Sequence, residues 1–451
     1  MKNVLLVYLP FCTPASPPFS LTSIYSFLKA NYNGGVSLLD LNLEFHKLKF
    51  SSYQRYFQDE KQWANYEEVF SDYFRESSKV YSENNRLVVD GKNPELFDEL
   101  LNQILDKKPD VVAFSIVYSS QSFYALLILK ALKGKIKTVI GGPAINERLS
   151  LIADKTLSND VELLEFISEK KTDSTKLDFN YVTDFNVFKL KEYFTPKPVV
   201  PIKTSTSCYY KQCTFCSHHK NVKYVEYPLE IIKNNIKSSK QKYFFLIDEM
   251  ISVDRLLKFA EIVKDLNIKW ACQLKPTKEY TSVVLKKLKD AGLEMAMWGV
   301  ESGNQRILDL MKKGTNVLDV KTVLKNTHDN GIKTIVYIMF GFPTETKEEF
   351  LDTINFLKEN SKYIDLVSTT VFGLQSNTKI YEKPGGFGIK NVNEEERIVL
   401  EPKITYEITS GLTKEGAMKL RKNYKKTLEK INKYPKGMNY FREHMLISNY
   451  N

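Results

Sequence analysis

Short apolar runs alternate with longer amphipathic stretches along most of this chain. In the first 167 residues, the apolar runs have the length of strands that are buried on both faces. The expected strands are 4–9, 36–41, 111–116 and 138–140, and the expected helices are 21–30 and 123–132. Because parallel strands need crossover helices, residues 1–167 are predicted to form an α/β domain with a doubly wound parallel sheet.

An aromatic-rich stretch interrupts this first domain at residues 44–103. Its apolar positions recur at steps of three and four, which predicts amphipathic helices that pack against the sheet. The chain then becomes polar over residues 168–197, where we expect a linker between domains.

Six further strand–helix units are expected over residues 198–378. The strands are 199–205, 243–247, 269–274, 295–300, 334–340 and 366–372, and the helices are 228–238, 254–266, 281–291, 304–313, 317–330 and 347–360. Such a succession predicts a partial (β/α)6 barrel of the TIM type, with functional groups at the carboxyl ends of the strands. A small, mainly helical region that caps the barrel and contacts substrate is expected over 379–451, with a helix at 414–432.

Composition narrows the class of protein. The chain has 451 residues, a hydrophobic content of 43% and a net charge of +11. No apolar run approaches the roughly 18 residues needed to cross a bilayer, so we expect a soluble, cytoplasmic protein without a membrane partner. The lysines are spread along the predicted helices, which favours a solvated surface over a nucleic-acid partner.

Three of the five cysteines lie within nine residues, at Cys208, Cys213 and Cys216. A disulfide is disfavoured because cysteines are sparse and no export leader starts at Met1. Two metal sites remain possible. A structural zinc site would take His218 or His219 as its fourth ligand, whereas an iron–sulfur cluster would keep one iron open for a substrate or cofactor.

The cysteine segment Cys-Tyr-Tyr-Lys-Gln-Cys-Thr-Phe-Cys, together with Gly-Val-Glu-Ser-Gly at 299–303 and Gly-Phe-Pro at 341–343, resembles the radical S-adenosylmethionine (SAM) enzymes over residues 199–372. The resemblance implies that the three cysteines hold a [4Fe-4S] cluster whose fourth iron binds SAM. It also implies SAM contacts at Phe215, Asp248, Glu249, Glu301, Ser302, Gly341 and Phe342. The cysteine spacing of four and then two residues resembles a cobalamin-dependent subgroup linked to the maturation of peptide natural products.

The first 165 or so residues resemble the cobalamin (B12)-binding domain of B12-dependent enzymes. The resemblance lies in Ser115-Ile116-Val117 after the third strand and Gly141-Gly142 after the fourth. It implies cobalamin contacts at Pro10, Phe11, Cys12, Asp40, Ser115, Ile116, Val117, Gly141, Gly142 and Pro143. The loop after the first strand has no histidine, so no imidazole from that loop is expected to bind cobalt.

Together, these resemblances imply a cobalamin-dependent radical SAM methyltransferase. It would use a 5′-deoxyadenosyl radical and methylcobalamin to methylate an unactivated carbon of a peptide, protein or natural-product intermediate. A flavodoxin or ferredoxin would supply electrons. Tyr209, Tyr210 and Cys272 are candidates for the substrate cavity, although a buried core position is the alternative for Cys272.

Two other functions stay open. A radical SAM enzyme that keeps the same domains could catalyse cyclisation, epimerisation or sulfur insertion instead. A non-enzymatic iron–sulfur or zinc protein is the alternative from a different class.

Overall fold

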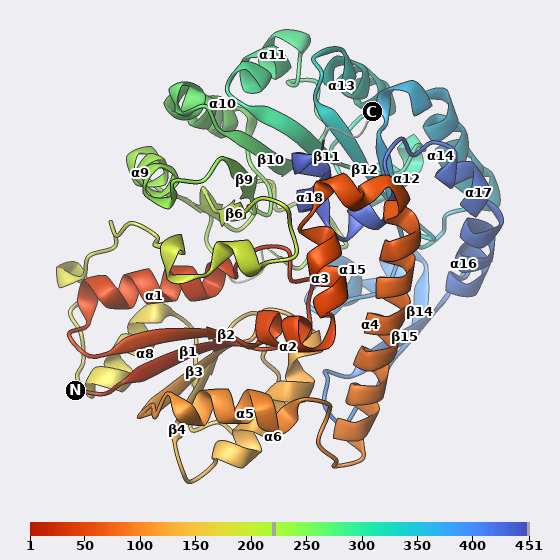
Figure 1. The fold of residues 1–451 in the computed structure, drawn as a ribbon. Helices are drawn as coiled ribbons and strands as arrows, with labels where there is room; N and C mark the ends of the chain where they lie inside the picture. The colour runs from red at the N-terminus through yellow and green to blue at the C-terminus, as the bar shows by residue number, and fades with distance from the viewer. Residues whose placement is uncertain (219–221, 449–451) are drawn as a thin grey trace. The chain divides into compact units, whose positions relative to one another are not determined.

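The computed structural model describes residues 1–218 and 222–448, which form two compact units (Figure 1). Unit 1 contains Met1–Val200, Asn234–Lys240 and Glu396–Glu401, and unit 2 contains Pro201–Lys233, Gln241–Glu395 and Pro402–Asn451. Within the described residues, no helix combines the length and the apolar character that crossing a membrane requires.

Unit 1 is built on a five-stranded parallel sheet with the order β2-β1-β3-β4-β5. Its strands are β1 (Val4–Tyr8), β2 (Val36–Asp40), β3 (Val111–Ser115), β4 (Lys137–Gly141) and β5 (Lys155–Leu157). Every residue of β1 and β3 is buried, as expected for strands covered on both faces. The predicted doubly wound α/β fold is therefore confirmed, with the short strand β5 in addition.

The helices of unit 1 include four in the aromatic-rich stretch, as the apolar spacing predicted. They are α1 (Phe19–Asn31), α2 (Leu41–Lys49), α3 (Ser51–Phe57), α4 (Tyr66–Val89), α5 (Phe97–Asp106), α6 (Ser122–Leu132), α7 (Glu147–Ser150) and α8 (Asp160–Ser168). Phe57, Tyr66 and Tyr73 of this stretch are buried against one another. Aromatic packing between helices therefore fixes the stretch within unit 1.

The polar segment 168–197 packs into unit 1 instead of extending away from it. Phe185, Tyr193 and Phe194 are buried, and the backbone N–H of Phe194 donates to the Pro14 carbonyl. The physical reason is that a few large aromatic side chains, spaced among polar residues, bury enough apolar surface to hold the segment in place.

Unit 2 contains a six-stranded parallel sheet with the order β6-β9-β10-β11-β12-β13. Its strands are β6 (Val199–Ile202), β9 (Tyr243–Leu246), β10 (Lys269–Leu274), β11 (Leu293–Glu301), β12 (Lys333–Phe340) and β13 (Leu366–Val371). The helices between them are α9 (Leu229–Ser239), α10 (Val253–Val263), α11 (Ser282–Asp290), α12 (Gln305–Leu310), α13 (Val317–Asp329) and α14 (Lys347–Glu359). This sequential order confirms the partial (β/α)6 barrel (Figure 1).

The C-terminal region is less helical than predicted. The expected helix 414–432 is divided into α16 (Lys414–Asn423) and α17 (Lys425–Glu429), preceded by α15 (Lys379–Glu382) and followed by α18 (Arg442–Ile447). Two hairpins were not predicted, β14 (Ile389–Glu395) with β15 (Lys403–Ile408) and β7 (Ser205–Thr206) with β8 (Val225–Glu226). β7 and β8 have two residues each and β14 is mostly exposed, so the apolar pattern gave no signal for them. β15 alternates polar and apolar residues (Lys-Ile-Thr-Tyr-Glu-Ile), and this strand signal was missed.

Candidate functional site

The start of the cysteine loop is hydrogen-bonded to a buried carboxylate, that of Asp248, which lies two residues after β9. The Asp248 side chain accepts hydrogen bonds from the backbone N–H of Thr204 at 3.0 Å, from its hydroxyl at 2.9 Å and from the Ser205 hydroxyl at 2.7 Å. Cys208 then pairs with Met250 in an isolated parallel bridge. These contacts anchor the start of the loop to the end of the neighbouring strand.

The middle of the cysteine loop rests on the segment that follows α12. The buried Thr214 donates from its backbone N–H to the Met311 carbonyl at 2.9 Å and from its hydroxyl to the Leu310 carbonyl at 3.2 Å. The Tyr210 hydroxyl donates to the Lys312 carbonyl at 2.9 Å. The loop is therefore held at its start and in its middle, so its thiols are pre-positioned by the barrel.

Cys208 lies close enough to Cys213 and Cys216 to affect the ionisation of both. Burial raises the pKa of Cys213, and the neighbouring thiolates of Cys216 and Cys208 raise it further, while the Lys313 ammonium opposes both effects. Burial also raises the pKa of Cys216. Burial and mutual repulsion therefore make the free thiolates unfavourable. Binding of a cation such as iron would stabilise the deprotonated thiols.

The histidines that were considered as a fourth zinc ligand have different outcomes. The backbone N–H of His218 donates to Cys216, which lowers the pKa of that thiol. His219 lies outside the described residues. Across residues 1–218 and 222–448, no three His, Cys, Asp or Glu side chains are placed to hold a single metal ion.

Two buried lysines accompany the thiols, and the sequence analysis missed both. Lys313 is 4% exposed, and its ammonium lies 2.8 Å from Glu301 Oε1. Burial lowers the pKa of Lys313, but the Glu301 carboxylate and the Cys213 thiolate raise it more, so the ammonium stays charged. Lys313 falls within the helix expected at 304–313, so nothing in the sequence distinguished it from a solvent-exposed lysine.

Lys275 is the second buried lysine, at 5% exposure, and directly follows β10. Its ammonium lies 3.2 Å from the centroid of the Tyr210 ring, a cation–π contact with the cysteine loop. Burial lowers the pKa of Lys275 to about 8, while the Cys213 thiolate acts in the opposite direction. The loop thus has a cation beneath one of its two tyrosines.

The residues of the Glu301-Ser302-Gly303 motif contact two different parts of unit 2. Glu301 turns toward the thiols, with the ion pair described above. The Ser302 hydroxyl lies 3.1 Å from the Thr353 hydroxyl, which also accepts from the Gly303 backbone N–H at 3.0 Å. A Cβ at Gly303 would lie 2.6 Å from Phe356 Cβ, so glycine is required for this close approach to α14.

The Gly341-Phe342-Pro343 loop meets the cysteine loop through aromatic contacts. Phe342 is fully buried, and its ring packs edge-on against Phe215 at 6.5 Å and Phe372 at 5.2 Å between centroids. The Gly341 backbone N–H donates to the buried carboxyl of Glu345. Residues 215 and 342, which the sequence indicated separately, are thus brought into one cluster.

The remaining candidates in unit 2 have local partners. Glu249 forms an ion pair with Lys203 at 3.0 Å, and Tyr209 lies beside Tyr210 with its pKa raised to about 12, mainly by burial. Cys272 is fully buried on the same face of β10 as Trp270, whose ring packs against Phe259 of α10. Cys272 therefore faces the helix layer and not the inside of the barrel, so a role in the substrate cavity is not supported.

In unit 1, the ten residues that the cobalamin resemblance indicated lie where β1 to β4 end. The strand register pairs Tyr8 with both Asp40 and Ser115, and pairs Ser115 with Gly141, so these ends share one edge of the sheet, called the unit-1 rim below. Pro10, Phe11 and Cys12 follow β1, Ile116 and Val117 follow β3, and Gly142 and Pro143 follow β4.

Hydrogen bonds within the chain tie the unit-1 rim together. The Tyr193 hydroxyl donates to Asp40 at 2.8 Å, and the Cys12 backbone N–H donates to Asn42 Oδ1 at 2.9 Å. Burial raises the pKa of Asp40 to about 6 and that of Cys12 to about 12. Burial therefore favours the neutral forms of both groups.

Two further features of the rim were not foreseen. Gly142 has φ +124°, and a Cβ there would lie 2.3 Å from the Ile116 carbonyl oxygen, so packing between the loops already requires this glycine. His46 is fully buried with its ring 4.8 Å from that of Phe11, and burial lowers its pKa to about 4. His46 lies on α2, so it does not alter the absence of histidine from the first loop.

Comparison with known proteins identifies the class. Residues 202–357 match the family described as the radical SAM superfamily. The chain is 21% identical over 355 residues to an uncharacterised methyltransferase of Pyrococcus horikoshii, covering 68% of this chain and 76% of that protein. It is 26% identical over 200 residues to the bacteriochlorophyllide d C-12(1)-methyltransferase of Chlorobaculum tepidum, covering 42% of each. It is also 27% identical over 157 residues to the anaerobic magnesium-protoporphyrin IX monomethyl ester cyclase of Rubrivivax gelatinosus, covering 33% of this chain and 28% of that protein.

Solved structures share the fold. The cobalamin-dependent SAM radical enzyme OxsB, solved with aqua-cobalamin and SAM, matches 99% of this chain and 70% of its own with a TM-score of 0.62 and 14% identity. The radical SAM methyltransferase TsrM of Kitasatospora setae matches 89% of this chain and 80% of its own with a TM-score of 0.59 and 14% identity. The chain is therefore an enzyme of the radical SAM superfamily. Its fold over nearly the whole length is that of cobalamin-dependent radical SAM enzymes.

Proposed function

We propose that the protein is a cobalamin-dependent radical SAM methyltransferase that methylates an unactivated carbon of a peptide, protein or natural-product intermediate. The observation that carries the proposal is the set of three neighbouring thiols beside the buried Lys313–Glu301 pair. Two relatives and the structural neighbour TsrM are named as methyltransferases, which supports methyl transfer.

The residues of unit 2 fit a [4Fe-4S] cluster with SAM. Cys208, Cys213 and Cys216 would bind three irons, and the open corner would take the amino acid part of SAM. When bound, the cluster would supply the electron that splits SAM into methionine and a 5′-deoxyadenosyl radical, and cobalamin would supply the methyl group. The buried ammonium groups of Lys313 and Lys275 would offset the negative charge of the thiolates.

The unit-1 rim fits cobalamin. Phe11, Cys12 and Val117 are half-buried, and Gly142 and Pro143 are exposed at the same edge of the sheet. Ligands of open parallel sheets bind at this edge. Because the Cys12 thiol stays neutral near pH 7, and because Asp40 and the Cys12 backbone are engaged in hydrogen bonds, the rim suits a large ligand that is held mainly by shape and by polar contacts of its side arms.

The test uses protein purified anaerobically with cobalamin and with its iron–sulfur cluster reconstituted. We expect a corrin band in the visible spectrum, formation of 5′-deoxyadenosine from SAM with a reductant, and transfer of label from methyl-labelled SAM to an added acceptor or to cobalamin. Absence of 5′-deoxyadenosine would refute radical SAM chemistry in this chain.

A second reaction has one specific observation in its favour. The relative from Rubrivivax gelatinosus is named as a cyclase. Formation of 5′-deoxyadenosine and a bound corrin, without any transfer of the labelled methyl group, would favour this alternative over methyl transfer.

A further inference from the structure

Helix α14 contacts one chain segment that was predicted to bind SAM, 301–303, and is linked through Arg306 to Thr344, which directly follows the other, 341–343. These segments end the neighbouring parallel strands β11 and β12, which are paired from Met295 to Glu301. Beyond the strands, the sheet no longer fixes the spacing of the two segments. Something outside the sheet must therefore hold them, because a ligand that touches both requires a constant distance between them.

The first segment is fixed to the middle of α14. As described above, the Thr353 hydroxyl binds Ser302 and Gly303, and Gly303 packs against the helix so closely that no side chain fits. One residue further on, the Asn304 side chain donates to Asp352 at 2.8 Å. These contacts place one end of the first segment against consecutive residues of α14.

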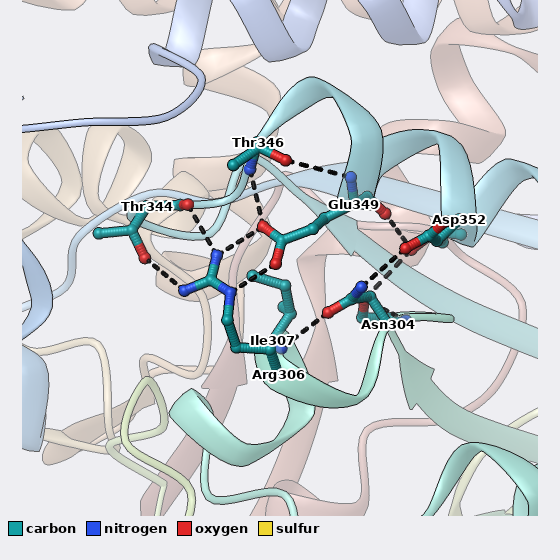
Figure 2. Close-up of polar contacts among 9 residues, drawn as sticks. Asn304, Arg306, Ile307, Thr344, Thr346, Glu349 and Asp352 are labelled. Atoms are coloured by element: carbon teal, nitrogen blue, oxygen red, sulfur yellow. Dashed lines mark hydrogen bonds and ion pairs between the residues drawn. The ribbon is translucent and has the colours of Figure 1, made fainter.

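Thr344, which directly follows the second segment, is fixed to the start of α14 through Arg306, which lies three residues after the first segment. Arg306 donates to the Thr344 carbonyl at 2.9 Å and to the Thr344 hydroxyl at 3.2 Å. Its other donors bind both carboxylate oxygens of Glu349. Figure 2 shows the guanidinium of Arg306 between Thr344 and Glu349, with Asn304 reaching Asp352 on the same helix.

Glu349 also caps the N-terminus of α14. Its carboxylate accepts the Thr346 backbone N–H at 2.9 Å, and the Thr346 hydroxyl accepts the Glu349 backbone N–H, so the two residues form the capping box of α14. The Glu349 side chain is 13% exposed, whereas that of Arg306 is 48% exposed. A largely buried, helix-fixed carboxylate therefore orients a longer and more mobile arginine.

We propose that α14 is a shared platform for the two SAM-binding segments and that Arg306 and Glu349 are positioning residues that set the distance between them. The inference rests on the proposed function, because it concerns how the same site holds SAM. Neither residue is proposed to touch SAM. Their effect is to keep Glu301 and the Gly341-Phe342-Pro343 loop in register with each other.

The test measures SAM cleavage to 5′-deoxyadenosine by the full, reconstituted chain without substrate. For Arg306→Gln and for Glu349→Gln, we expect the KM for SAM to rise about tenfold, with iron content unchanged and kcat reduced less than KM is raised. Arg306→Lys keeps the charge but not the two-pronged geometry, so it is expected to fall between wild type and Arg306→Gln. The double variant Arg306→Glu/Glu349→Arg is expected to recover part of the loss seen in either single reversal.

Lys325→Gln is the matched control, because it removes an exposed ion pair with Asp329 on α13, elsewhere in the same unit. It should leave the KM for SAM unchanged. An Arg306→Gln protein with wild-type KM would overturn the platform, and so would a loss that tracks melting temperature or iron content equally in all variants. If wild type itself makes no 5′-deoxyadenosine, the proposed function fails instead, so the two failures are distinguishable.

Discussion

The two parallel sheets of this protein end in rims that differ in their buried charges. The unit-2 rim is the edge where the carboxyl ends of the barrel strands meet the cysteine loop, with Glu301 and Lys313 beside the thiols. At the unit-1 rim, burial favours the neutral forms of Cys12 and Asp40, with pKa values raised to about 12 and about 6. At the unit-2 rim, Lys313 keeps its charge although it is almost completely buried, because a carboxylate and a thiolate lie beside it. One edge has a hydrogen-bonded carboxyl with a pKa of about 6, and the other has a buried ion pair beside thiols.

This difference shows how one type of architecture can serve two kinds of ligand. A buried charge is costly unless it has an opposite charge as a partner, so a site that keeps several buried charges is built around a charged ligand. A rim whose polar groups are already satisfied can instead accept a large ligand through shape. The contrast agrees with an iron–sulfur cluster and SAM in unit 2 and cobalamin in unit 1.

The strongest way to break the comparison is to remove a thiol from the unit-2 rim. Cys213→Ala and Cys216→Ala should each abolish 5′-deoxyadenosine formation and lower the iron content, because each thiol would bind one iron of the cluster. Iron analysis and visible spectra after anaerobic reconstitution measure this. The controls are Cys12→Ala and Cys272→Ala, which should keep wild-type iron. Iron loss in Cys12→Ala would show that the unit-1 rim also contributes to iron binding, and iron loss in Cys272→Ala would show that the cysteine triplet is not the whole ligand set.

The next largest effect is expected from the buried ion pair. Lys313→Met leaves the Glu301 carboxylate buried without its partner, which should cost about 3 kcal/mol of folding free energy and strongly reduce SAM cleavage. Denaturant unfolding of the cluster-free protein gives the first quantity. Lys313→Arg should retain most of the stability.

A double variant separates stability from chemistry at this pair. Lys313→Met/Glu301→Gln removes both charges, so it should regain stability without regaining SAM cleavage. Recovery of cleavage in the double variant would mean that neither charge takes part in binding SAM.

The strands and most helices of both units were predictable because each buried element carries its own apolar pattern. The strand at 269–274 was predicted with the bounds that β10 has, and α13 ends one residue before its predicted end. Lys275 and Lys313 could not be found in this way, since a lysine in sequence indicates solvent unless its surroundings are known. The burial of Phe185 and Tyr193 within the expected linker could not be predicted either, because it depends on contacts with residues that are distant in the sequence.

The contacts between α14 and the segment 302–303 could not be predicted from the sequence either. Ser302 and Gly303 were expected to serve SAM, yet the structure gives Ser302 a partner on the helix and gives Gly303 a packing role. Contacts between residues some fifty positions apart leave no periodic signal, so only the fold reveals them.

A smaller effect is expected at Glu345, whose buried carboxyl makes the stability of unit 2 depend on pH. Burial raises the pKa of its carboxyl to about 8, and one of its oxygens accepts the Gly341 N–H. The folded state therefore holds a proton that the unfolded state releases at lower pH, so stability should fall as pH rises from the unfolded pKa to about 8. Glu345→Gln mimics the protonated form and should lack this fall. Parallel unfolding curves across that range for both proteins would disprove the assignment.

The smallest expected effect concerns the unit-1 rim. Tyr193→Phe removes the hydrogen bond to Asp40 and should cost about 1 kcal/mol at neutral pH. Burial raises the pKa of Asp40 to about 6, and the Tyr193 hydroxyl opposes that rise, so the variant should shift the pKa further upward. Between the unfolded pKa and the folded one, the native state binds the extra proton, and stability falls as pH rises.

The loss of stability in Tyr193→Phe should therefore be smaller at pH values below the unfolded pKa of Asp40, where the carboxyl is protonated in both states. Above the folded pKa, the carboxylate loses a donor and the loss is at its full size. Unfolding of wild type and variant on both sides of this range measures the difference, with Asp40→Asn as a reference that cannot ionise. A loss that is equal at all pH values would mean that Tyr193 contributes packing alone. The hydrogen bond from Tyr193 to Asp40 would then contribute nothing to the stability of the unit-1 rim.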